Sequence, residues 1–230
     1  MIEKNIFQSW YTKTLPPYVD DFLKMNTEYK YYLYDDDDMD KFVKEHYPGE
    51  IYECYNRLNI IVAKVDLWRY LILYKYGGIY LDMDSSINKP LTQLIKEDDH
   101  AIITAEGNPF FFVQWALIFE SGHPILRRTI EYCIENIKTN AFPNDIHKMT
   151  GPTVYTRAIQ DIHRELYGNV ITSRTSCTDI TYAKGNVQYR LFGVDYNSFF
   201  SFKHPLSRML YINKKHWTRE QKEKPLLKST

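Results

Sequence analysis

The largely apolar segment 63–86 contains six charged side chains, and four of them could form a site: Asp66, Arg69, Asp82 and Asp84. Asp82 and Asp84 directly follow a β-favouring run, and carboxylates at a spacing of two lie on the same side of a strand, with Cα atoms roughly 6.6 Å apart. Paired carboxylates suit hard divalent cations such as Mg²⁺ or Mn²⁺, which proteins commonly share with substrate phosphates. The pair therefore predicts a metal site, and a simple polar turn is the alternative.

Asp66 and Arg69 are three residues apart, which places them on neighbouring positions of one helical face. An isolated ion pair contributes little to stability, and burying it can cost more than it returns. A site that binds a hydroxylated ligand would use both side chains. The alternative is a structural ion pair that braces the helix.

A helix is expected to carry Asp66 and Arg69, because apolar residues recur there at steps of three and four. These residues, which we expect on one face, are Leu58, Ile61, Val65, Trp68, Ile72 and Tyr76. Gly77 and Gly78 follow where a left-handed C-cap is favoured, and Lys75 lies in the last turn. The short strand 79–81 would then lead into Asp82 and Asp84.

Strand-like and helix-like segments alternate along the rest of the chain. We expect strands at 5–8, 29–34 and 101–105, helices at 16–25, 124–138 and 153–166, and short β runs at 170–172, 187–192, 199–202 and 209–212. This order indicates an α/β fold with a mainly parallel nucleotide-binding sheet, whose ligand lies beyond the carboxyl ends of the strands. No glycine-rich phosphate motif occurs, so phosphate recognition would need a metal and basic side chains. The aspartate run 35–40 is expected to cap a helix that starts near Met39 rather than to bind calcium.

The combination of residues around these aspartates is specific. Ala63-x-x-Asp66-x-x-Arg69-Tyr70, Tyr74 and Gly77-Gly78-Ile79-Tyr80-x-Asp82-x-Asp84 resembles the signature of the DXD sugar transferases of glycosyltransferase family 32. That group includes yeast initiating α-1,6-mannosyltransferases and bacterial capsular polysaccharide transferases, with the catalytic domains of the large clostridial glucosylating toxins as more distant relatives. The resemblance implies a GT-A fold, a Rossmann-like mixed sheet flanked by helices. It also implies Asp66, Arg69, Asp82 and Asp84 as catalytic residues, with Asp82 and Asp84 on Mn²⁺ or Mg²⁺.

Further landmarks of that family are spread along the chain. Residues 5–10 resemble its first strand, with Phe7 in place of a His, and this implies that Phe7, Gln8, Trp10, Tyr70 and Asp82 contact the nucleotide. Gln114 stands near the position of an expected Asn, and Thr150-Gly151-Pro152 resembles a third landmark. Near the C-terminus, the resemblance makes His216 the expected third metal ligand, with Asn213 as the next candidate. Gln114 and Trp217 are further possible site residues.

Length and composition are those of one globular domain. The chain has 230 residues, and Lys+Arg and Asp+Glu are equal at 29 each, so no net field would attract nucleic acid. We expect a single domain with a nucleotide-sugar-binding half at about 1–105, an acceptor-side half at about 106–217 and a short tail at 218–230. The three cysteines form no CxxC pair, which indicates neither a disulfide framework nor a zinc cluster.

The N-terminus is too polar for a signal peptide, and no long apolar run indicates an integral membrane segment. We therefore expect a cytoplasmic protein, peripheral to a membrane at most, or a protein of the secretory lumen if the sequence is a trimmed form.

The predicted function is the metal-dependent transfer of a hexose from a nucleotide-sugar to a glycan or another hydroxyl acceptor. The resemblance implies retention of anomeric configuration, and we favour a UDP-sugar over a GDP-sugar as the donor. Two alternatives stay open. Residues 79–84 also resemble the DxD strand of haloacid dehalogenase-type phosphatases, although Ser85-Ser86 follows instead of a Gly-containing pair. A non-catalytic carbohydrate-binding module on a transferase fold is the other.

Overall fold

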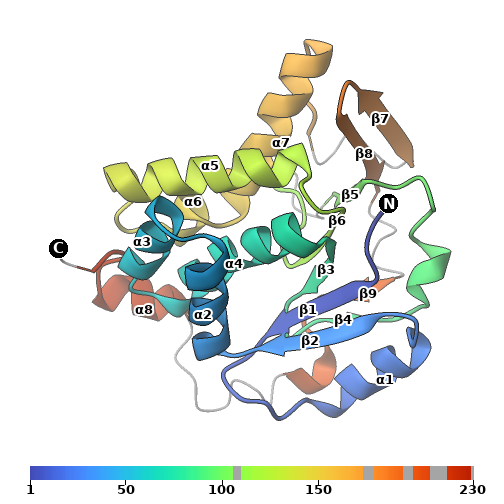
Figure 1. Ribbon diagram of the computed structural model, residues 1–230, viewed down its shortest axis with the longest axis horizontal. Helices are drawn as coiled ribbons and strands as arrows, with labels where there is room; N and C mark the ends of the chain where they lie inside the picture. The colour runs from blue at the N-terminus through green and yellow to red at the C-terminus, as the bar shows by residue number, and fades with distance from the viewer. Residues whose placement is uncertain (106–109, 173–178, 194–198, 208–216, 229–230) are drawn as a thin grey trace.

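The computed structural model describes residues 1–105, 110–172, 179–193, 199–207 and 217–228 (Figure 1). A seven-stranded sheet in the order β2-β1-β3-β6-β5-β8-β7 forms its centre. Its strands are β1 (Asn5–Ser9), β2 (Lys30–Tyr34), β3 (Gly78–Leu81), β5 (Ala101–Thr104), β6 (Ala116–Phe119), β7 (Ile180–Lys184) and β8 (Val187–Phe192). A separate two-stranded sheet pairs β4 (Ser86–Ile87) with β9 (Phe200–Ser201).

The main sheet is mixed. Strand β1 runs parallel to β2 and β3, and β5 runs parallel to β8. Strand β6 is antiparallel to both β3 and β5, and β7 is antiparallel to β8. The mixed GT-A sheet is thus confirmed, whereas the expectation of a mainly parallel sheet is wrong. Hydrophobic patterning indicates that a strand is buried but not the direction in which it runs. The antiparallel direction of β6 could therefore not be predicted from the sequence.

Helices cover both faces of the sheet. They are α1 (Pro17–Met25), α2 (Asp36–His46), α3 (Glu50–Arg57), α4 (Ile61–Tyr76), α5 (Pro124–Thr139), α6 (Ile146–Met149), α7 (Pro152–Tyr167) and α8 (Trp217–Glu223), with a 3₁₀ turn at Leu91–Gln93. Figure 1 shows α1 on one side of the sheet and α4, α5 and α7 on the other.

Alternate side chains of the central strands enter two different hydrophobic cores. In β3, Tyr80 packs into the core formed with α2, α4, α5 and α7, whereas Ile79 and Leu81 pack into the core under α1. This is the two-residue period of a strand that is buried on both faces. Strand β3 therefore lies in the middle of the molecule, and its carboxyl end points to the edge where Asp82 follows.

Helix α4 is buried over nearly its whole circumference between Asp66 and Leu73, because it lies between β3, α2 and α5. The prediction of one apolar face is wrong: Ile61 and Tyr76 are exposed, and Leu58 precedes the helix. A helix that is apolar all round has no single face for periodicity to detect.

Two glycines set the turn from α4 into β3. Gly77 has φ 59° and Gly78 has φ 110°, backbone conformations that residues with a Cβ rarely adopt. A Cβ on Gly78 would lie 2.5 Å from the carbonyl oxygen of Asn5 on the neighbouring strand. The positive φ predicted after the helix is confirmed, although the ψ of 176° at Gly77 is extended rather than left-handed helical.

Most other expected elements are present, with ends shifted by one or two residues. Asp35 caps α2 in a reciprocal capping box with Asp38, as the aspartate run predicted, but the helix begins at Asp36 rather than near Met39. Edge strand β7 was missed, Val170 and Ile171 do not form a strand, and 209–212 lies outside the described residues. Among the helices of the described ranges, none is long and apolar enough to traverse a lipid bilayer.

Candidate active site

Asp82 and Asp84 lie just beyond β3 in a turn of residues 82–85, which we call the aspartate turn. The Asp82 N–H donates to the carbonyl of Trp115 at 2.8 Å, and the Ser85 N–H donates back to the carbonyl of Asp82 at 3.0 Å. Because the backbone turns here, the two carboxylates are not on one side of a strand, and that expectation was wrong. Their predicted position beyond the carboxyl end of the strand is confirmed.

The first three carbonyl groups of the aspartate turn accept hydrogen bonds from three separate segments. Gln8 Nε2 donates to the first at 3.2 Å, and the Tyr18 hydroxyl donates to the second at 2.6 Å. The His204 N–H donates to the third at 2.7 Å. The backbone that carries the two carboxylates is therefore fixed from β1, from α1 and from the segment after β9.

Arg69 joins helix α4 to the aspartate turn. Its guanidinium lies 3.2 Å from Asp66 and 3.3 Å from Asp82, and it donates to the Gln114 carbonyl at 3.1 Å. The side chains of Arg69 and Asp66 are each 5% exposed, whereas that of Asp82 is 28% exposed. Burial acts to lower the pKa of Arg69, but the charges of Asp82 and Asp66 outweigh it and raise that pKa.

Asp66 is the centre of a buried hydrogen-bond network. Gln114 Nε2 donates to one carboxylate oxygen at 3.0 Å, and the Thr150 hydroxyl donates to the other at 3.2 Å. Gln114 Nε2 also donates to the Tyr70 hydroxyl at 2.7 Å, which donates to the Thr150 carbonyl at 3.2 Å. Burial raises the pKa of Asp66, and Arg69 and Gln114 oppose this by stabilising the carboxylate. The network ties α4 to the segments before β6 and α7.

Tyr80 fixes the orientation of the first carboxylate. Its hydroxyl donates to Asp82 Oδ1 at 2.6 Å, and the guanidinium of Arg69 lies 4.5 Å from its ring centroid. The sequence motif includes Tyr80 but gave it no role. Its spacing of two from Asp82 was the only available signal, and a core residue would have the same spacing.

The residues expected to contact a nucleotide differ in accessibility. Phe7 is a core residue with 2% exposure, and Tyr32 stacks on its ring with centroids 5.2 Å apart, so a direct base contact does not fit its position. Tyr70 and Gln8 are fully buried, and both act here through hydrogen bonds to neighbouring residues. Trp10 is half-buried beside Tyr11, so Trp10 and Asp82 keep surface that a nucleotide could contact.

The carboxylate oxygens of Asp82 and Asp84 are suitable ligands for Mg²⁺ or Mn²⁺, provided that substrate phosphates and water complete the coordination. Within the described ranges, no group of three or more His, Cys, Asp or Glu side chains is arranged to hold a metal ion. His216 and Asn213 lie outside the described residues, and Trp217 begins α8. His204, which sequence reasoning missed, reaches the site through its backbone bond to Asp84.

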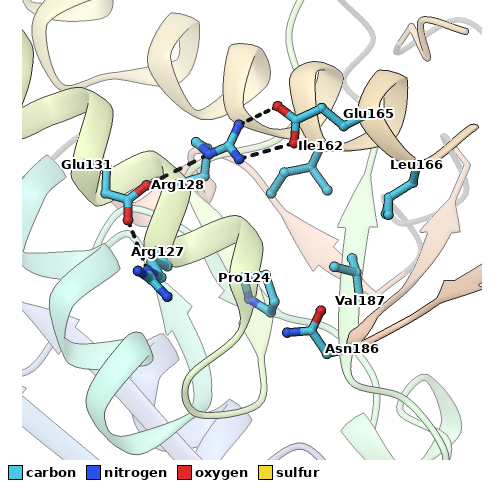
Figure 2. A pocket seen from close by; sticks show the side chains of 9 residues that line it. All are labelled: Pro124, Arg127, Arg128, Glu131, Ile162, Glu165, Leu166, Asn186 and Val187. Carbon is cyan, nitrogen blue, oxygen red and sulfur yellow. Dashed lines mark hydrogen bonds and ion pairs between the residues drawn. The ribbon is translucent and has the colours of Figure 1, made fainter. Parts of the chain in front are cut away.

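A surface cavity of about 350 Å³ lies away from the aspartate turn, between α5, α7 and the β7–β8 turn (Figure 2). Arg127 pairs with Glu131 at 2.9 Å, and Arg128 pairs with Glu165 at 2.8 Å. The charges in its wall are matched to one another, and the second pair braces α5 against α7. We place the candidate active site at the aspartate turn.

The fold is that of a GT-A glycosyltransferase. It is similar to the solved structure of PaToxG glycosyltransferase, with a TM-score of 0.55 at 20% identity over 73% of this chain and 70% of that chain. Residues 12–101 match the family model described as glycosyltransferase sugar-binding region containing DXD motif. This segment includes α4 and the aspartate turn, so the resemblance to the DXD glycosyltransferases is confirmed there.

Three curated relatives extend the match beyond that segment. Inositol phosphoceramide mannosyltransferase 3 of Schizosaccharomyces pombe is 30% identical over 56% of this chain and 36% of its own length. The initiation-specific alpha-1,6-mannosyltransferase of Candida albicans is 24% identical over 68% and 52%. An uncharacterized glycosyltransferase of Acanthamoeba polyphaga mimivirus is 28% identical over 79% and 72%. The chain thus spans about a third to a half of the length of the two mannosyltransferases.

Proposed function

We propose that this chain transfers a hexose from a nucleotide-sugar to a hydroxyl group of a glycan or a similar acceptor. The observation that carries the proposal is the aspartate turn, which is fixed by its backbone and joined by Arg69 to the buried carboxylate of Asp66. Two carboxylates at the end of a buried strand, beside a buried ion pair that faces the same edge, suit a ligand with both phosphates and hydroxyl groups.

Transfer breaks the bond between the anomeric carbon and an oxygen of the donor's β-phosphate, and the bonding electron pair stays on that oxygen. The acceptor oxygen bonds to the anomeric carbon, and its proton passes to the departing diphosphate. A divalent cation held by Asp82 and Asp84, when bound, would neutralise charge on the leaving diphosphate. Arg69 and Asp66 would orient the sugar hydroxyls, with Arg69 also holding Asp82 in place.

The sugar is taken to be a hexose, and the names of the relatives favour mannose. The sequence favoured UDP over GDP, so a donor panel must contain both nucleotides. Retention of anomeric configuration, implied by the family resemblance, is tested by NMR of the product anomer. An inverted product would reject that part of the proposal.

The decisive experiment is calorimetric titration of the chain with Mn²⁺ and a panel of UDP- and GDP-sugars, followed by an assay of donor hydrolysis. The change Asp84→Asn should abolish metal-dependent donor binding while leaving the unfolding curve close to that of the wild type. The matched control is Asp37→Asn, at an exposed aspartate in the first turn of α2. If Asp84→Asn binds and turns over donor like the wild type, the metal assignment is wrong. If the wild type binds no donor, a non-catalytic module becomes the better interpretation.

A further inference from the structure

The segment 199–207 lies along the chain that leaves the aspartate turn. Ser86 pairs with Ser201 and Ile87 with Phe200 in the small antiparallel sheet, and the Asn88 N–H donates to the Phe199 carbonyl at 2.6 Å. At the other end of this ladder, the His204 N–H donates to the Asp84 carbonyl at 2.7 Å. Lys203 is therefore the residue directly before one that bonds to the aspartate turn.

Lys203 has a backbone conformation that lysine rarely adopts. Its φ is 56°, and among the described non-glycine residues only Asn140 shares a positive φ. Asn140 is the C-cap of α5, where asparagine is favoured, so its conformation is explained locally. Lys203 ends no helix, and such strained residues cluster at ligand-binding positions.

The ammonium group of Lys203 contacts an aromatic stack that includes Trp115, a backbone partner of the aspartate turn. Lys203 Nζ lies 5.0 Å from the ring centroid of Phe202, and that ring stacks on Trp115 with centroids 5.0 Å apart and an interplanar angle of 24°. The Trp115 carbonyl accepts the hydrogen bond from the Asp82 N–H. Lys203 is thus connected to one aspartate through its backbone neighbour and to the other through this stack.

Within the described part of the chain, no carboxylate pairs with the ammonium group of Lys203. Its side chain is in no ion pair with another described residue, whereas Arg69, the other cation described at this site, is already paired with Asp66 and Asp82. An ammonium group that contacts a ring, on a segment whose next residue bonds to the aspartate turn, is available to an anionic ligand that brings its own countercharge. No glycine-rich loop exists to bind phosphates through backbone N–H groups.

We propose that Lys203 binds the diphosphate of the donor nucleotide. This inference rests on the proposed function and adds to it a specific cationic residue for the leaving group. Lysine suits this position because it acts as a compact point charge that a diphosphate can meet from several directions.

The test compares nucleoside diphosphates with monophosphates. We would titrate UDP, GDP, UMP and GMP into the chain by calorimetry with Mn²⁺ present. The variants are Lys203→Gln, which removes the charge, Lys203→Arg, which keeps it, and Lys203→Gly, which also relieves the positive φ. The control is Lys89→Gln: Lys89 Nζ lies 5.1 Å from the ring centroid of Phe199, the same kind of contact, but at the far end of the ladder. Lys89 stands five positions after Asp84, with β4 between them.

Lys203→Gln should weaken the affinity for the diphosphate by about tenfold relative to the wild type. This is the size expected for one charge-assisted contact. The matching monophosphate should change less than about twofold, because it lacks the β-phosphate. Lys203→Arg and Lys89→Gln should bind the diphosphate like the wild type. Lys203→Gly should raise the melting temperature and still lose diphosphate affinity, which a purely structural role would not produce.

The proposal is overturned if Lys203→Gln binds the diphosphate as tightly as the wild type. It is also overturned if this variant loses affinity for the diphosphate and the monophosphate by the same factor. In either case the donor site itself stands, since the wild type binds nucleotide. If the wild type binds neither diphosphate, the proposed function fails and this inference fails with it.

Discussion

Two buried arginines, Arg69 and Arg190, each face two carboxylates, but their contacts differ. On β8, Arg190 donates to both oxygens of Asp99 at 2.7 and 2.6 Å, to Asp179 at 2.9 Å and to the Leu94 carbonyl at 2.6 Å. In the candidate site, the contacts of Arg69 with Asp66 and Asp82 are 3.2 and 3.3 Å. Its Nε is buried and has no hydrogen-bond partner among the described residues.

Exposure does not separate the two arrangements, because each arginine has one buried and one partly exposed carboxylate. Asp179 is 38% exposed and Asp82 is 28% exposed. The difference lies in hydrogen-bond saturation: Arg190 makes a short two-oxygen contact with Asp99, whereas Arg69 makes longer contacts and leaves a donor unused. A buried donor without a partner costs about 1–3 kcal/mol. We infer that Arg190 holds the fold together, while Arg69 is arranged to share its charge with a ligand.

The largest effect is expected at Arg190. Arg190→Met would leave Asp99 buried without its partner, which should lower the free energy of unfolding by about 3–5 kcal/mol. Urea denaturation at neutral pH measures this. The variant that remains folded should bind nucleotide like the wild type. A loss below about 1 kcal/mol would remove the structural half of the comparison.

The same substitution at Arg69 should act mainly on activity. Arg69→Met should reduce turnover of donor by about 10²–10³-fold, the cost of losing one preorganised charged contact. Its loss of stability should be smaller than that of Arg190→Met, because burial already raises the pKa of Asp66 and Asp82 is partly exposed. Kinetic assays and urea denaturation of both variants provide the comparison. If Arg69→Met proves the less stable variant while turnover is unchanged, the two roles are reversed.

A pH-dependent effect on stability is expected from His123, which lies beside β8, the strand that carries Arg190. His123 Nε2 donates to the Gln188 carbonyl at 2.9 Å, and Nδ1 accepts from the Ile125 N–H at 3.2 Å. Burial lowers the pKa of His123 to about 4. The unfolded chain, with a histidine pKa of about 6.5, therefore binds more protons between these values, so stability falls as pH is lowered from about 6.5 to 4, by up to about 3 kcal/mol.

Urea denaturation at pH 7.5, 6, 5 and 4.5 measures this slope. His123→Asn keeps an N-cap acceptor for Ile125 but cannot titrate, so its stability should depend less steeply on pH than that of the wild type. Equal slopes for the two proteins would show that His123 does not contribute.

The smallest effect is expected at Thr150. Thr150→Val removes one hydrogen bond to Asp66, while Arg69 and Gln114 still hold that carboxylate. The free energy of unfolding should fall by about 1 kcal/mol, and turnover should fall less than about tenfold. A larger loss of turnover than for Arg69→Met would show that Thr150, rather than Arg69, controls the position of Asp66.

Local patterns predicted much of the fold and part of the site. The glycine pair after α4, the strand before Asp82 and a helix cap within the aspartate run 35–40 were all predicted, because each depends on residues a few positions apart. The apolar face of α4 and the placement of Asp82 and Asp84 on a strand were predicted wrongly. In both cases segments distant in the sequence decided the result. Helix α5 packs against α4 and buries it, and Trp115, just before β6, bonds to the aspartate turn.

The sequence by itself determined the types and spacing of Asp66, Arg69, Asp82 and Asp84, and with them the chemistry that the site can perform. The tertiary structure alone decided which partners hold them. Thr150 meets Asp66 across 84 positions of sequence and Gln114 meets it across 48. The His204 backbone reaches Asp84 from beyond the small sheet. Such contacts depend on how separate segments pack against one another, and no local preference of the chain encodes that.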